Sequence, residues 1–117
     1  MALTMTRKRT QTALTKLAQL LADVNGELAF LVETVARPLV PLTEADSARL
    51  RLRRAQLDKS RAALCMTIRQ FDPSIDPDDI GSSENWLHTR ARTARSRQRV
   101  YLATLRTTTE SEGHQTD

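Results

Sequence analysis

The chain has 117 residues and a formal net charge of +4, with 39% hydrophobic but only 3% aromatic residues. A chain of this length forms one domain at most, and its core has to be built from aliphatic side chains. Three glycines and four prolines are too few for a loop-rich β protein, and no apolar run reaches the ~18 residues of a membrane-spanning helix. We therefore expect an all-α protein, with a single helical domain over residues 1–109 and no membrane segment.

The cysteine content and the N-terminal residues give information about the cellular compartment of the protein. Cys65 is the only cysteine, so the chain has no disulfide framework, which fits a reducing compartment. Residues 1–22 are basic, rich in threonine and free of acidic residues, as in a mitochondrial transit segment. A regular helical pattern continues directly from Leu14, however, and no compact apolar segment resembles a signal peptide. We interpret these residues as the opening of a helix and predict a cytoplasmic protein.

The first predicted element is a long helix over residues 6–36. Its apolar residues recur at alternating steps of three and four, the heptad spacing of a coiled coil. They are Leu14, Leu17, Leu21, Val24, Leu28, Leu31 and Val35. Such a seam packs against a partner helix, which belongs either to the same chain or to another one. Because few aromatic residues are present to thicken a monomeric core, we predict a homodimer or a larger assembly, or a second helical protein as partner.

Gly26 is the weak point of this helix. Asn25-Gly26 could also mark a hairpin turn, but the seam keeps its phase through the pair. We expect Gly26 on the outer face, where it costs little packing. Pro38 then ends the helix, and Pro41 keeps the chain extended.

The second helix is predicted over residues 44–71. Thr43 has the character of an N-cap, and Asp46 three residues later completes a variant capping box. Leu50, Leu57 and Leu64 form part of its apolar line. Since the two helices have similar lengths and are joined by a short turn, we predict a long antiparallel helical hairpin.

An acidic linker containing two prolines follows over residues 72–82. An EF-hand loop that began at Asp76 would place Gly81 correctly, but Leu87 would stand where the bidentate glutamate is required. Asp76 followed by Pro77 is instead typical of a capped single helical turn. We expect Ile75 and Ile80 to pin this loop onto the end of the hairpin.

A third helix is predicted over residues 83–107, packed along the hairpin as in a three-helix bundle. Its seam includes Leu87, Gln98, Tyr101 and Leu105. Residues 110–117 are polar and weakly acidic, and we predict that they form a disordered tail.

Catalytic and metal-binding patterns are not recognisable. Zinc sites need several Cys or His ligands at close spacing, whereas this chain has Cys65, His88 and His114. We interpret Cys65 as a packing residue and His88 as a surface residue. The sequence therefore predicts no cofactor, no metal and no enzymatic activity.

Arginine is the most distinctive residue type of the second and third helices. Four arginines of the predicted third helix are spaced so that they lie in a single stripe along it. Two arginines of the second helix are further candidates for contact with a nucleic acid. These arginines are Arg92, Arg95, Arg99 and Arg106 on the third helix, with Arg49 and Arg53 on the second. Guanidinium groups suit phosphate, so a basic stripe is typical of a nucleic-acid interface. Arginines also form solvated helix faces and cover apolar surface, and aromatic residues for base stacking are almost absent.

Together these features favour a non-catalytic helical module for protein–protein interaction or assembly, which associates with itself through its helix seam. The alternative is a small nucleic-acid-binding accessory or regulatory protein that uses the arginines of the second and third helices.

Overall fold

The computed structural model describes residues 2–87 and 91–116, and gives side chains for residues 11–87 and 91–108. Three α-helices account for most of this part of the chain: α1 (Ala2–Ala36), α2 (Glu44–Phe71) and α3 (Ala94–Thr116). One 3-10 turn, η1 (Pro77–Asp79), lies between α2 and α3. No strand occurs among the described residues, and the all-α prediction is confirmed.

α1 is continuous over its 35 residues and begins four residues before the predicted start. It passes through Asn25 and Gly26 without interruption, as the unbroken heptad indicated. Arg37 N donates the final turn bond to Glu33 O at 2.8 Å. Pro38 has no N–H with which to extend the ladder, so the helix ends where the sequence predicted.

α2 begins at a complete capping box. Thr43 Oγ1 accepts a hydrogen bond from Asp46 N at 3.0 Å, and Asp46 Oδ2 accepts one from Thr43 N at 3.1 Å. At the other end, Asp72 N donates to Ile68 O at 2.9 Å, and Pro73 follows directly. The bounds of α2 therefore agree with the prediction, because both ends are set by local sequence.

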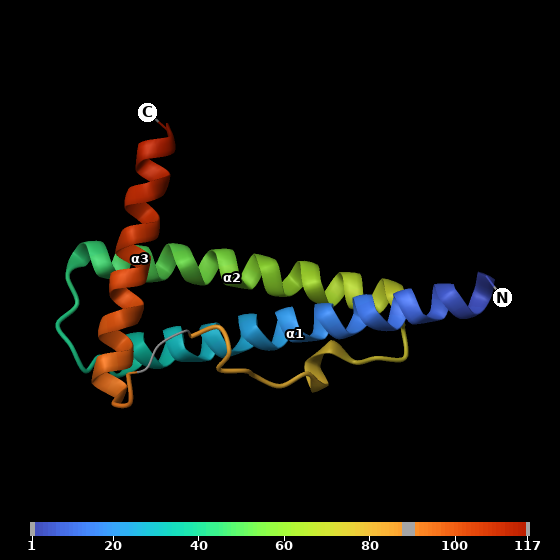
Figure 1. Cartoon of the computed structure of the whole chain (residues 1–117). Coiled ribbons are helices and arrows are strands. Elements are labelled where there is room, and N and C mark those ends of the chain that lie inside the picture. Colours follow the sequence, from blue (N-terminus) through green and yellow to red (C-terminus); the bar gives the residue numbers. More distant parts are fainter. Residues whose placement is uncertain (1, 88–90, 117) are drawn as a thin grey trace.

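α1 and α2 lie side by side as a long antiparallel hairpin (Figure 1). We call the end of the hairpin where residues 37–43 join the two helices the closed end, and the opposite end the open end. Two core clusters hold the helices together. Near the open end, Leu21 packs with Cys65 and Ile68, and near the closed end, Leu31 packs with Leu50 and Leu57.

The predicted seam of α1 is covered mainly from within the chain. Leu21 and Leu31 are 0% and 1% exposed. Four further seam residues are partly buried against the two core clusters: Leu14, Leu17, Val24 and Leu28. Val35 is the exception, because 52% of it is exposed. The seam thus packs against other elements of its own chain over all but its last position.

The segment after η1 lies across α1. We call residues 80–87 the strap. Asn25 Nδ2 donates to Ile80 O and Gly81 O at 3.2 and 3.3 Å, and Ser83 N donates to Ala22 O at 2.9 Å. These bonds hold the strap directly against the backbone of α1.

Gly26 is therefore not on an open outer face, and that prediction was wrong. The residue is buried, and a Cβ atom there would lie 1.8 Å from Ser83 O and 2.7 Å from Trp86 Nε1. The missing side chain is what lets the strap approach the helix so closely. A heptad pattern shows which face meets a partner helix, but it does not show that a non-helical segment covers the opposite face.

The acidic linker forms the predicted capped turn. Asp76 Oδ1 accepts from Asp78 N at 3.0 Å at the start of η1. Ile75 and Ile80 pack against the Leu21 cluster, so the loop is pinned near the open end of the hairpin as expected. Arg61 of α2 adds a polar tie, with Nε donating to Asn25 Oδ1 at 3.0 Å and Nη2 lying 3.4 Å from Asp78 Oδ1.

α3 begins about ten residues later than predicted and ends later as well. Thr93 caps it, with Oγ1 accepting from Ser96 N at 3.1 Å and O accepting from Arg97 N at 3.0 Å. The strap stays non-helical because Trp86 is held edge-on between Phe30 and Tyr101, at centroid distances of 5.5 and 5.6 Å. Tertiary packing has overridden local helix propensity here.

The predicted disordered tail over 110–117 is also corrected, since α3 continues to Thr116. No proline interrupts the segment, so the ladder of backbone hydrogen bonds can continue through it. Figure 1 shows α3 crossing the hairpin near its closed end, and not lying along it as the sequence suggested. Tyr101, Leu102 and Leu105 make that crossing by packing on the Leu31 cluster.

Candidate interaction surfaces

A buried polar cluster lies where α3 crosses the hairpin. Arg53 of α2 binds Glu27 of α1 through two bonds, Nε to Oε2 at 2.6 Å and Nη2 to Oε1 at 2.8 Å. Tyr101 of α3 donates its hydroxyl to Glu27 Oε2 at 2.8 Å. Glu27 is 9% exposed, and these three bonds satisfy a carboxylate that would otherwise be costly to bury.

The electrostatics of this cluster fix its charge state. Burial raises the pKa of the Tyr101 hydroxyl far above its usual value, and the nearby Glu27 carboxylate raises it further. The hydrogen bond to Glu27 raises the pKa of Arg53 as well. Tyr101 thus stays neutral and Arg53 stays charged near neutral pH. Through Glu27, these two groups join α1, α2 and α3.

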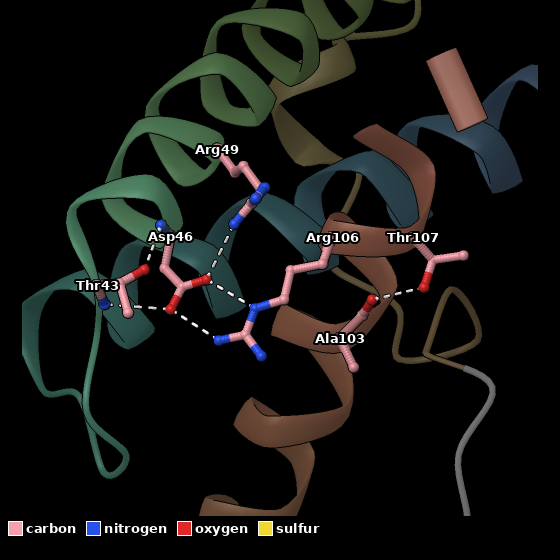
Figure 2. A network of polar contacts seen from close by, with 6 residues as sticks. All are labelled: Thr43, Asp46, Arg49, Ala103, Arg106 and Thr107. Atoms are coloured by element: carbon pink, nitrogen blue, oxygen red, sulfur yellow. Dashed lines mark hydrogen bonds and ion pairs between the residues drawn. The ribbon is translucent and has the colours of Figure 1, made fainter. Parts of the chain in front are cut away.

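A second network joins α3 to the start of α2 (Figure 2). Asp46 is 1% exposed and accepts from Arg106 Nε at 2.9 Å, from Arg106 Nη2 at 2.8 Å and from Arg49 Nη1 at 3.3 Å. It also accepts from Thr43 N in the capping box. A residue predicted only as a helix cap is therefore the point where α3 is fastened to the hairpin.

The bidentate bond from Arg106 holds the pKa of Asp46 well below its usual value of 3.8, and the bonds from Thr43 act in the same direction. Burial alone would raise that pKa, so hydrogen bonding and charge outweigh desolvation at this carboxylate. Asp46 is consequently ionised throughout the ordinary pH range.

The six arginines predicted as nucleic-acid contacts divide into two groups. Arg49 and Arg106 bind Asp46, and Arg53 binds Glu27, so these three hold the fold together. The other three, Arg92, Arg95 and Arg99, are exposed and make no ion pair with any described side chain. Because α3 begins at Ala94, Arg92 precedes the helix. Arg92 therefore does not belong to the stripe that the spacing of Arg95, Arg99 and Arg106 places along α3.

The closed end of the hairpin exposes apolar side chains. Val32 and Val35 are 39% and 52% exposed, and they share one face of α1 because they are three residues apart. Leu39, in the loop that follows, is 44% exposed. The exposed prolines of that loop, Pro38 and Pro41, add further apolar surface. We call Val32, Val35 and Leu39 the closed-end patch.

A pocket of about 430 Å³ opens beside the polar cluster, where α1, α2, α3 and the strap meet. Glu27, Arg53 and Tyr101 lie among its lining residues. Leu52 and Val100, which are 55% and 36% exposed, also line it. Further lining residues are Arg49, Trp86, Leu87 and Leu105.

Sequence reasoning missed Glu27, Trp86 and the pocket. Glu27 immediately precedes the seam residue Leu28, and an acidic residue beside a seam normally faces solvent. The one available signal was the scarcity of aromatic residues, because Phe30, Trp86 and Tyr101 meet in a single edge-to-face cluster. Nothing in the spacing of these residues indicated that α3 would cross α1 at that level.

The remaining candidate groups are Cys65, His88 and the acidic side chains. Cys65 is buried in the core cluster of Leu21 and Ile68, as its predicted packing role requires. His88 lies outside the described residues. Within the described part of the chain, no three His, Cys, Asp or Glu side chains gather closely enough to hold a metal ion. Among those residues no helix is long and apolar enough to cross a membrane.

The chain matches no family model, no curated protein and no solved structure.

Proposed function

We propose that this protein is a non-catalytic helical interaction module, which associates with a second copy of itself or with another helical protein through the closed-end patch. The observation that supports this is the exposure of Val32, Val35 and Leu39, which lie near one another in sequence at the closed end of the hairpin. Contiguous exposed apolar side chains commonly mark protein-binding surfaces. The buried part of the seam packs against α2, α3 and the loop residues Ile75 and Ile80, so it is not available to a partner.

Self-association can be tested by sedimentation or light scattering. We expect a species of twice the 13.2 kDa chain mass at micromolar concentration. The double substitution Val32→Asp and Val35→Asp places two charges in the proposed interface and should give the mass of one chain. Leu20→Asp is the matched control, because Leu20 is a 53% exposed residue of the same helix outside the patch, and it should leave the mass unchanged.

If the partner is a protein of another sequence, we expect the wild type to be monomeric on its own and to form a complex with that partner. The Val32→Asp, Val35→Asp variant should lose this complex, and the Leu20→Asp control should keep it. A monomeric wild type that captures no helical protein from its own cells would contradict the proposal. An equal effect of Leu20→Asp would also contradict it, since the interface would then lie elsewhere.

The second candidate function is contact with nucleic acid through Arg92, Arg95 and Arg99. It is supported by the exposure of these three guanidinium groups and by their lack of ion pairs with described side chains. If they bind phosphate, affinity for duplex DNA should fall with salt at a logarithmic slope near −0.9 per phosphate neutralised. Arg95→Gln with Arg99→Gln should then flatten the slope by about two units.

The matched control for this measurement is Arg51→Gln with Arg54→Gln, which removes two exposed arginines from α2 instead. Equal losses in both variants would indicate general charge attraction and not a site. No measurable affinity near physiological salt would eliminate this candidate.

A further inference from the structure

The pocket between α2, α3 and the strap has the size of a binding site for a small molecule. Its volume of about 430 Å³ lies in the range of pockets that hold small organic ligands. It is distinct from the closed-end patch, since it is lined by none of the residues that form that surface. What it could bind follows from its apolar walls and from its charge.

The apolar part of the lining is not covered by the chain itself. Leu52 of α2 and Val100 of α3 line the pocket and remain 55% and 36% exposed. Leu105 and the partly buried Trp86 and Leu87 provide further apolar surface. A flat or branched hydrocarbon body in this position would remove the exposed leucine and valine from water.

The charged side chains that line the pocket carry a net positive charge. Glu27 is fully engaged by Arg53 and Tyr101, so that pair carries no net charge. Asp46, by contrast, is shared between two arginines, and Arg106 takes both of its oxygen atoms. One positive charge therefore remains uncompensated, and of the two arginines Arg49 is the one that lines the pocket.

Arg49 also has an unused donor. Its guanidinium makes one hydrogen bond to a described residue, the long one from Nη1 to Asp46 Oδ1 at 3.3 Å, and its Nε is buried with no acceptor among those residues. Buried donors in folded proteins nearly always have an acceptor, so this guanidinium is suited to an additional oxygen ligand. A small shift of Arg49 toward the pocket would present that donor to a bound anion.

We propose that this pocket binds a small organic anion, whose apolar body lies against Leu52, Val100 and Trp86 and whose carboxylate, sulfonate or phosphate group pairs with Arg49. The proposal does not depend on self-association. A neutral ligand would leave the charge of Arg49 uncompensated, and an inorganic anion would leave the apolar walls exposed.

Anilinonaphthalene sulfonate, an aromatic anion, is a suitable probe, and neutral N-phenylnaphthylamine is its matched counterpart. Trp86 is the only tryptophan of the chain and lines the pocket, so energy transfer from it to the probe reports binding at this site. We expect saturable binding of one sulfonate probe per chain, at least about fivefold tighter than binding of the neutral probe.

Two pairs of variants separate the contributions. Leu52→Asp should weaken binding of the sulfonate about tenfold or more, whereas Leu20→Asp, at an exposed leucine outside the pocket, should leave binding unchanged. Arg49→Gln should abolish the preference for the anionic probe. Arg51→Gln removes the same charge from an exposed position nearby and should retain that preference.

Circular dichroism of every variant checks that the fold is intact, and Arg49→Lys provides a second test if Arg49→Gln unfolds, because it should keep a reduced preference for the anion. Absence of saturable transfer from Trp86 would overturn the proposal. Equal effects of Leu52→Asp and Leu20→Asp would overturn the location, and equal effects of Arg49→Gln and Arg51→Gln would overturn the role of Arg49.

Discussion

At the scale of single residues, Gly26 is the position where the structure differs most clearly from what the sequence pattern predicts. In an exposed helix interior, replacing glycine with alanine stabilises a protein by about 1 kcal/mol. Here the new Cβ would collide with Ser83 O, a backbone atom that cannot rotate away. We therefore expect Gly26→Ala to destabilise the protein by about 1–3 kcal/mol, as overpacking usually does.

Urea denaturation of this variant shows directly whether the substitution raises or lowers the free energy of unfolding. Gly81→Ala is the control, because no atom lies within 4 Å of the position that its Cβ would take, and the free energy of unfolding should change little. A Gly26→Ala variant more stable than wild type would show that the strap does not lie on α1.

Asp46 is the second residue with a measurable signature. Its pKa is lowered in the folded state, so the unfolded chain binds more protons as the pH falls below about 4. The stabilising contribution of Asp46 is therefore complete above that pH and is lost progressively as the pH falls through the folded-state value. Asp46→Asn removes the charge from both arginine bonds and should cost about 2–3 kcal/mol at pH 7.

The test is the free energy of unfolding between pH 7 and pH 2, compared for the two proteins. The difference in the free energy of unfolding between wild type and Asp46→Asn should become smaller as the pH falls below 4. Asp58→Asn, at an exposed carboxylate of the same helix, should have the same free energy of unfolding as wild type at each pH. A constant gap would mean that the ionised form of Asp46 is not what joins α2 to α3.

At the scale of the helices, the predictable parts were those set by neighbouring residues. The heptad and Pro38 gave the extent of α1 closely, and Thr43 with Asp46 gave the start of α2. The start of α3 was wrong, because Trp86 packs between Phe30 and Tyr101 and keeps the strap out of a helix. Contacts between residues more than fifty positions apart leave no periodic trace in the sequence.

The same distinction applies to the candidate surfaces. Arginine content indicated a basic face, but which arginines remain exposed depends on where α3 crosses the hairpin. Arg106 reaches Asp46 only because of that crossing, and Arg53 is bound to Glu27 across the hairpin. Spacing along a helix places side chains on a face, and only the tertiary structure shows what that face meets.

The seam of α1 yields a prediction at this scale. Leu21 is fully buried, so Leu21→Ala should reduce the free energy of unfolding by about 2–5 kcal/mol. Val35 belongs to the same heptad but is half exposed, and Val35→Ala should cost no more than about 0.5 kcal/mol at concentrations where the chain is monomeric. Equal costs at the two positions would indicate that the seam is buried along its whole length, as it would be between two chains.

At the scale of the whole molecule, the chain is an elongated hairpin crossed at one end by a third helix, with extents of 58 × 37 × 23 Å. The long dimension is close to the ~52 Å expected for a 35-residue helix. A thin core with few aromatic residues is reinforced at the crossing by two ion-pair networks, each centred on a buried carboxylate. Exposed apolar side chains at the closed end and around the pocket mark the two places where we propose binding.

The central claim is that the fold is completed within one chain and that association uses only the surface left over. The most direct test is the melting temperature of the Val32→Asp, Val35→Asp variant, followed by circular dichroism over a hundredfold range of protein concentration. The account predicts a cooperative transition with a midpoint that does not depend on concentration. A midpoint that rises with concentration would contradict it, because the seam of α1 would then be closed between chains.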